Sequence, residues 1–164
     1  GDVYKRQGSG SKFLIDKNIV DESLFEKEES DEINYLAYGD ARENRGKEQI
    51  GGVILNSMID LTHPLAFGYE NNTLPLYKNN SIWLKPSKNS YSSVVRYTDD
   101  SLIDGFLSEN NKSKIKESVS LVVSKVGKGI AVMFADNPNF RGAWYGTNRL
   151  FLNAILLGDK IYIP

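Results

Sequence analysis

The 164-residue chain contains no cysteine and a single histidine, His63. Without cysteine it can form no disulfide framework and perform no thiol redox chemistry. A structural zinc site takes about four Cys or His ligands, and a catalytic one about three protein ligands that are rich in histidine. One imidazole cannot supply either set. We therefore expect this chain to have no metal-ligating residue, no cofactor-binding residue and no cofactor of its own.

Strong net charge and long apolar runs are also missing. The net charge is −1, from 20 basic and 21 acidic residues, so the balance gives no reason to expect a nucleic-acid partner. The longest apolar run, Leu150–Leu157, is interrupted by Asn153 and falls short of the ~18 residues that a membrane-spanning helix requires. We therefore expect no membrane span. No signal peptide is visible, but the chain does not begin with Met and has the character of part of a longer protein.

Several catalytic signatures are absent too. The sequence has no Gly-x-Ser-x-Gly, no Walker loop, no His-Glu-x-x-His and no Gly-x-Gly-x-x-Gly. Together with the missing cysteine, this leaves no self-contained active site that a motif would reveal, and we expect no catalytic residue in the chain itself.

The composition that is present, 40% hydrophobic and 11% aromatic, is that of one globular domain. Residues 1–11 have the composition of a flexible tail. Their string Asp-Val-Tyr-Lys-Arg-Gln resembles the ragged ends of translated metagenomic assemblies, so we treat them as a flexible or non-native tail. Residues 12–49 form an acidic lead-in segment, 50–158 the domain and 159–164 a C-terminal tail. The acidic cluster at residues 21–32 is typical of a solvated surface and matches no Ca²⁺ loop.

The apolar patterns of the domain predict a sheet with helices. Residues 51–55 indicate a strand buried on both faces, and 74–84 and 91–98 two further strands. Residues 118–126 and 130–135 flank Gly-Lys-Gly and predict a β-hairpin. A helix over about 148–157, with Thr147 as N-cap and Gly158 as its stop, is apolar nearly all round, and we expect it to bury Phe151 and Ile155 against the sheet. These elements predict an α/β layered domain with a C-terminal hairpin and a sealing helix.

Asp60, Thr62 and His63 are the first candidate site. One interpretation is a carboxylate–imidazole dyad for proton transfer, which would make the chain a small hydrolase. The other is structural: Asp60 and Thr62 cap the turn that Pro64 forces, with His63 hydrogen-bonded inside it. We favour the structural interpretation because the neighbouring sequence offers no nucleophile.

The second candidate site is Asp136, Arg141, Trp144 and Tyr145, which follow the predicted strand over 130–135. Polar residues at the carboxyl end of a strand are where open α/β sheets place ligands. Asp136 and Arg141 would then contact a ligand or form an internal ion pair. Trp144 and Tyr145 would form a stacking platform for a sugar or peptide, or pack in the core. We favour the structural interpretation for both pairs.

Two stretches carry a family resemblance. They are Asp-Leu-Thr-His-Pro-Leu-Ala-Phe-Gly-Tyr at residues 60–69, and residues 127–154 with Ala-Asp-Asn-Pro-Asn-Phe-Arg-Gly-Ala-Trp-Tyr-Gly-Thr-Asn at their centre. Both resemble the C-terminal region of bacterial, Bacteroidetes-type zinc carboxypeptidase family proteins. In that family a metallopeptidase domain precedes a domain that is similar to class I glutamine amidotransferases, with a flavodoxin-like sheet.

The resemblance implies a flavodoxin-like accessory domain over residues 50–158, truncated at its N-terminal side. The family's zinc ligands, catalytic Glu and amidotransferase Cys have no counterpart here, so zinc is expected only in the absent peptidase domain. The resemblance further implies a periplasmic or secreted protein whose partner is the parent's peptidase domain, with a homo-oligomer as the other partner to consider. An independent sugar- or peptide-binding module remains the alternative function.

Overall fold

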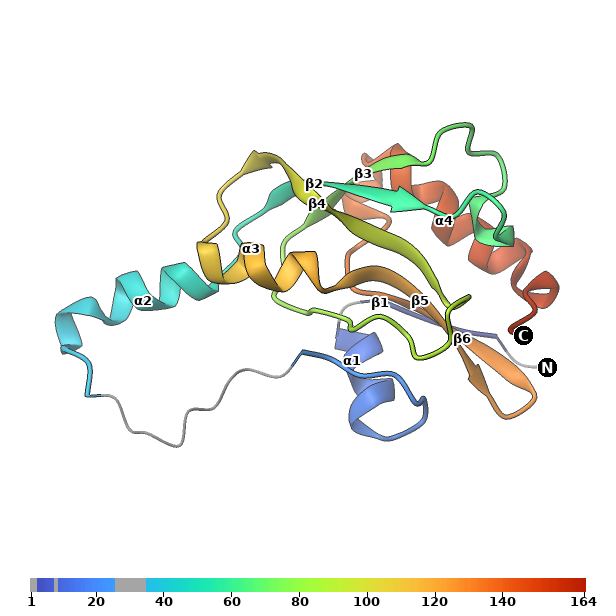
Figure 1. Cartoon of the computed structure of the whole chain (residues 1–164), viewed down its shortest axis with the longest axis horizontal. Helices are drawn as coiled ribbons and strands as arrows, with labels where there is room; N and C mark the ends of the chain where they lie inside the picture. Colours follow the sequence, from blue (N-terminus) through green and yellow to red (C-terminus); the bar gives the residue numbers. More distant parts are fainter. Residues whose placement is uncertain (1–2, 8, 26–34) are drawn as a thin grey trace.

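The computed structural model describes residues 3–7, 9–25 and 35–164, and Figure 1 shows how they are arranged. Most of the acidic cluster expected on the surface, residues 26–32, lies outside the described residues. The strands are β1 (Val3–Gln7), β2 (Val53–Ile59), β3 (Thr73–Lys78), β4 (Ser93–Gly105), β5 (Val119–Val126) and β6 (Gly129–Phe134). The α-helices are α1 (Ser9–Asp16), α2 (Ala41–Glu48), α3 (Glu109–Lys116) and α4 (Tyr145–Leu156). Short 3₁₀ helices are η1 (Tyr38–Asp40), η2 (Pro64–Ala66), η3 (Phe140–Gly142) and η4 (Gly158–Lys160).

The strands form one sheet in the order β1-β6-β5-β4-β2-β3. Neighbours among β2 to β6 are all antiparallel, and the parallel pair in the described residues is β1 with β6 at one edge. The expected mixed α/β class is thus confirmed. A flavodoxin-like sheet is parallel, because a crossover helix returns the chain to the same end before each new strand. The five antiparallel strands do not have that arrangement.

The predicted hairpin is confirmed. Val126 of β5 pairs with Gly129 of β6, which leaves Gly127 and Lys128 as the turn. Gly127 has a φ of 56°, a conformation that glycine adopts at little cost and that two-residue hairpin turns demand.

Strands β5 and β6 form the centre of the core because both of their faces are covered. Leu121, Val123, Val132 and Phe134 belong to the larger cluster on the side of α4, together with Leu150. On the other side Val122, Ala131 and Met133 pack with Leu14 of α1. Figure 1 shows α1 and α4 on opposite sides of these strands. This explains why residues 119–124 of β5 are all buried, without alternation between the two faces.

Strands β2 and β3 differ from their prediction. Strand β2 begins at Val53 and alternates in burial, with Met58 exposed, so only one of its faces is fully covered. Strand β3 ends at Lys78, whereas the predicted strand continued to residue 84. It lies at the edge of the sheet, where Pro75 is tolerated because an edge strand can leave one backbone position without a ladder donor.

Helix α4 begins at Tyr145 rather than Asn148, and its N-cap is Trp144 instead of Thr147. Thr147 is buried inside the first turn, where its hydroxyl donates to the Pro138 carbonyl. The predicted burial of Ile155 is wrong, since its side chain is 47% exposed. The face that packs carries Leu150, Asn153 and Ala154, with Phe151 half-buried beside Phe134.

The two predicted tails also contain structure. Residues 3–7 form β1 and residues 9–16 form α1, although the sequence predicted a flexible tail over 1–11. Strand β1 joins through backbone pairing to β6, and such pairing requires no apolar periodicity. At the other end Ile161 is buried in the main core, and Asn89 donates to the Pro164 carbonyl, so residues 159–164 pack onto the domain.

Candidate functional site

The turn that contains Asp60, Thr62 and His63 follows directly after β2. The Asp60 carboxylate accepts from the Thr62 backbone N–H at 2.9 Å and from the Thr62 hydroxyl at 2.7 Å. His63 is the N-cap of η2, and its Nδ1 accepts from the Leu65 N–H at 3.1 Å. An imidazole whose Nδ1 accepts this bond cannot also donate from Nδ1 to Asp60. The arrangement is that of a hydrogen-bonded turn.

Burial and hydrogen bonding shift both titratable groups of this turn. Burial lowers the pKa of His63, and the nearby Asp60 charge opposes that shift. The hydrogen bond from Thr62 lowers the pKa of Asp60. Both effects keep Asp60 ionised and His63 neutral near pH 7. The imidazole therefore keeps an unprotonated Nδ1 for Leu65.

Helix α4 and the turn are joined by side chains that bond to carbonyls. Asn153, buried in α4, donates from Nδ2 to the carbonyls of Leu65 and Phe67 at 2.8 and 2.9 Å. Arg149 donates to the Gly68 carbonyl, and the Tyr69 hydroxyl donates back to the Gly146 carbonyl. Burial raises the pKa of Tyr69 to about 12, so this hydroxyl remains a donor. The first block of the family resemblance therefore anchors the helix of the second.

Asp136 lies at the centre of a buried polar network at the carboxyl end of β6. Its Oδ1 is 3.0 Å from the Nζ of Lys78, and its Oδ2 accepts from the hydroxyls of Tyr97 and Ser120, each at 2.6 Å. Asp136 does not form the ion pair with Arg141 that the sequence suggested, because Lys78 of β3 is its partner instead. Arg141 instead lies exposed beside the Phe140 ring, with a φ of 53°.

The ammonium of Lys78 is fully satisfied. Besides Asp136 it donates to Asn80 Oδ1 at 3.3 Å and to the Ile82 carbonyl at 2.8 Å, which accounts for its three N–H groups. It also lies 4.4 Å from the centre of the Trp83 ring, a distance suited to cation–π attraction.

Burial governs the protonation of this network. Burial lowers the pKa of Lys78, and Asp136 counteracts that effect. The pKa of Tyr97 is raised well above its usual value by burial, and the adjacent Asp136 charge adds to the shift. The tyrosine therefore keeps its proton and donates it in a hydrogen bond. Sequence analysis missed Lys78 and Tyr97, although the alternation Leu74-x-Leu76-x-Lys78 places the lysine on the buried face of its strand.

Trp144 and Tyr145 do not form a common stacking platform. Trp144 is half-buried, donates its indole N–H to the Pro75 carbonyl at 3.3 Å and lies against Tyr77. Tyr77 in turn stacks on Phe140, with ring centres 4.0 Å apart. Tyr145 is 80% exposed. The structure thus places Trp144 in an aromatic cluster with Tyr77 of β3 and Phe140. Tyr145 lies at the surface, so the favoured interpretation of Tyr145 as a core residue is wrong.

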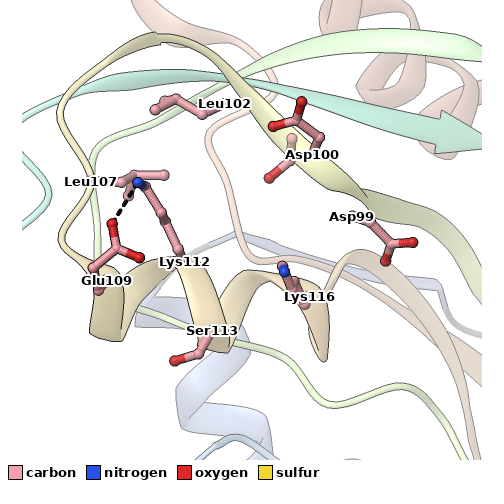
Figure 2. A pocket seen from close by; sticks show the side chains of 9 residues that line it. Asp99, Asp100, Leu102, Leu107, Glu109, Lys112, Ser113 and Lys116 are labelled. Carbon is pink, nitrogen blue, oxygen red and sulfur yellow. Dashed lines mark hydrogen bonds and ion pairs between the residues drawn. The ribbon is translucent and has the colours of Figure 1, made fainter.

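A groove that the sequence did not reveal lies between β4 and α3. It has a volume of about 620 Å³. Figure 2 shows Asp99 and Asp100 extending from β4, with Lys112 and Lys116 rising from α3 toward that strand. Lys112 is bonded to Glu109 at 2.7 Å. A sequence signal existed: an Asp-Asp pair interrupts a β-rich run, and a lysine-rich segment capped by Ser108 follows it.

An irregularity of β4 produces one wall of this groove. Tyr97 pairs with Ser57 and Leu102 with Leu55, so residues 98–101 of β4 lie opposite the single residue Asn56. Such bulges disrupt the ladder and turn side chains away from their regular alternation. Here the bulge brings Asp99, Asp100 and Ser101 to the groove.

Within the part of the chain that the structure describes, no group of three or more His, Cys, Asp or Glu side chains is placed to hold a metal ion. Among those same residues no helix is both long and apolar enough to cross a membrane. Comparison with protein-family models gave no match, and comparison with curated proteins and with solved structures gave none either.

Proposed function

We propose that this chain is a non-catalytic accessory domain of a zinc carboxypeptidase-like bacterial protein, periplasmic or secreted, and that it supports the parent's peptidase domain. The proposal rests on the two sequence blocks at residues 60–69 and 127–154. Its finer fold assignment, a relative of class I glutamine amidotransferases, rests on them as well, and the antiparallel order of β2 to β6 departs from that family's sheet.

The proposal that the domain is non-catalytic is supported by the hydrogen bonding of Asp136. This residue lies within the second block, and its carboxylate is held by Lys78, Tyr97 and Ser120 in a buried network. Each of these partners comes from a different strand, so the network ties β3, β4 and β5 to the end of β6. A carboxylate in that position stabilises the arrangement of the sheet.

The outer face of α4 is the surface that we propose contacts the peptidase domain. Leu152, Ile155 and Leu156 are exposed and lie at helical spacing on one side of α4, and exposed Phe67 lies beside this helix. Adjoining exposed apolar side chains of this kind mark interaction surfaces. The helix belongs to the second resembling block and packs its other face on this domain, which supports a contact with the remainder of the same protein.

The first test is the reading frame upstream of this sequence. We expect it to encode a peptidase domain with a His-x-x-Glu pair and a distant second His. A complete reading frame without such a domain would overturn the proposal.

The second test uses the peptidase domain and this domain expressed as separate chains. Leu152→Glu/Leu156→Glu should abolish their co-purification, because it places charge in an apolar contact. Ile103→Glu, the same change at an exposed apolar position of β4, should leave co-purification intact. If the α4 variant instead converts a dimer of this chain to monomer while leaving the peptidase bound, the face joins two copies and the proposed contact is wrong.

A further inference from the structure

The groove between β4 and α3 has charges of opposite sign on its two walls. Asp99 and Asp100 stand on the β4 wall and Lys116 on the α3 wall (Figure 2). Within the described residues the side chains of Asp99, Asp100 and Lys116 form no hydrogen bond or ion pair, whereas Lys112 forms an ion pair with Glu109. Paired charges would neutralise one another across the groove. Unpaired charges on separate walls leave it able to hold a ligand that carries both signs.

Ser101 adds a polar group to the lining of the groove. It lines the groove from the β4 bulge, and the residue is only 5% exposed. In the described part of the chain its hydroxyl has no hydrogen-bond partner. The hydroxyl oxygen is not among the fully enclosed polar atoms that lack a partner. It therefore keeps contact with solvent, where a polar ligand group can form a hydrogen bond with it.

The groove also has an apolar part. Leu102 and Leu107 line it between the charged walls. A second cavity of about 660 Å³ adjoins it, shares Leu107 and Glu109, and is lined further by exposed Phe106 and Leu36. The first cavity alone is within the ~300–1,000 Å³ typical of small-molecule sites. The two together have room for more than a single amino acid.

We propose that the β4–α3 groove binds a short peptide with free ends, its ammonium at Asp99 and Asp100, its carboxylate at Lys116 and an apolar side chain on Leu102 and Leu107. A phosphate-like dianion fits less well, because the two aspartates would repel it. A metal ion fits less well, because among the described residues no group of three or more His, Cys, Asp or Glu side chains is placed to hold one. The proposal goes beyond the accessory role and does not rest on it, since it uses no residue of the resembling blocks.

The test is titration of the full chain with L-leucyl-L-leucine, followed by isotope-edited NMR of backbone amides and by calorimetry. Shifts should concentrate on residues 99–102 and on α3. N-acetyl-leucyl-leucine and leucyl-leucine amide, which each lack one end charge, should bind about fivefold more weakly, as expected for losing one exposed ion pair. Free leucine should bind more weakly than the dipeptide because it cannot reach Leu107 and Lys116 together.

Variants assign each end of the peptide. Lys116→Gln should weaken the free dipeptide about fivefold and leave the amide unchanged, whereas Asp100→Asn should weaken the amide and leave the N-acetyl peptide unchanged. Lys114→Gln removes the same charge from α3 at a residue that does not line the groove, and it should change nothing. Thermal melts check that every variant folds.

Three outcomes would overturn the proposal. They are the absence of shifts at millimolar dipeptide, shifts confined to residues outside the groove, and equal binding of a peptide blocked at both ends. The last would show that apolar contact alone holds the ligand. None of these outcomes bears on the peptidase partner, which the α4 variants test separately.

Discussion

Lys78 and Asp136, 58 residues apart in the chain, form an ion pair of 3.0 Å in which the lysine side chain is fully buried. Neither charge could stay in the interior alone, because the desolvation of a single ion costs several kcal/mol. The pair, with Tyr97 and Ser120, fixes how β3, β4 and β5 meet the end of β6.

Replacing one partner of this pair should be severe. Lys78→Met leaves the Asp136 charge buried without its cation, and we expect the free energy of unfolding to fall by about 3–5 kcal/mol in a urea titration. Lys125→Met, at an exposed position of β5, should stay within about 0.5 kcal/mol of the original chain. The double variant Lys78→Met/Asp136→Leu should be more stable than Lys78→Met alone. Equal losses in the single and double variants would mean that the uncompensated charge is not the cause.

His63 should make stability depend on pH. Its pKa in the folded chain is lowered by burial, so the unfolded chain binds more protons between that lowered pKa and the unfolded value of about 6.5. The contribution of neutral His63 to the free energy of unfolding is therefore fully present above about pH 6.5. It is lost as the pH falls through this window. Because the chain has one histidine, its Cε1 proton in NMR reports the pKa directly. A midpoint above 6.5 would contradict the assignment.

The Leu65 N–H bond of His63 gives a second test. His63→Ala should cost about 1 kcal/mol at pH 7, as removal of an N-cap acceptor does. His63→Asn, which keeps an acceptor, should cost less. At pH 5 the difference in stability between the original chain and the His63→Ala variant should shrink, because a doubly protonated imidazole can no longer accept from Leu65. Denaturant titrations at both pH values measure it.

Helix α4 should respond differently on its two faces. Leu150→Ala removes a buried side chain from the main core and should cost about 2–5 kcal/mol. Ile155→Ala, on the exposed face, should stay within about 0.5 kcal/mol. A large loss at Ile155 in the isolated chain would show that this face is covered in solution, as in a homo-oligomer, and sedimentation of the same sample would then show the assembly.

Asn153 should matter more than its place in an apolar helix suggests. Asn153→Ala removes both hydrogen bonds to the Leu65 and Phe67 carbonyls and should cost about 1–3 kcal/mol. Asn148→Ala, which removes a hydrogen bond from the same helix to exposed Asn139, is the matched control and should cost less than about 1 kcal/mol. Equal losses of stability in the Asn153→Ala and Asn148→Ala variants would mean that the two hydrogen bonds of Asn153 are not what stabilises the fold.

Zinc content is a prediction from the sequence count of one histidine and no cysteine. Chelator-washed protein should contain no stoichiometric zinc by elemental analysis. One tightly held zinc per chain would contradict it and would direct attention to the carboxylates of the lead-in segment.

The strongest local patterns determined their elements without tertiary information. The Gly127-Lys128 turn between two apolar runs demanded a hairpin, because short connections allow only antiparallel neighbours. The apolar stretch before Gly158 demanded a helix, and that helix ends at Leu156, with Leu157 as its C-cap and Gly158 directly after the cap. Pro64 and the short polar side chains before it likewise determined a turn, since proline fixes the backbone of the residues around it.

Tertiary structure decided what these elements meet. The sequence offered Arg141 as the neighbour of Asp136, but packing brought Lys78 from β3, because strand order in the sheet is set by long-range pairing. The burial of α4 was overestimated for a similar reason. Periodicity shows which residues share a face, but which apolar side chains find a partner depends on surfaces that come from elsewhere in the chain.

The β4–α3 groove depends on a bulge in β4, and only the pairing of β4 with β2 defines where that bulge lies. A sequence specifies its local geometry through the backbone preferences of neighbouring residues, whereas its buried charges and its cavities arise from contacts between residues far apart in the chain.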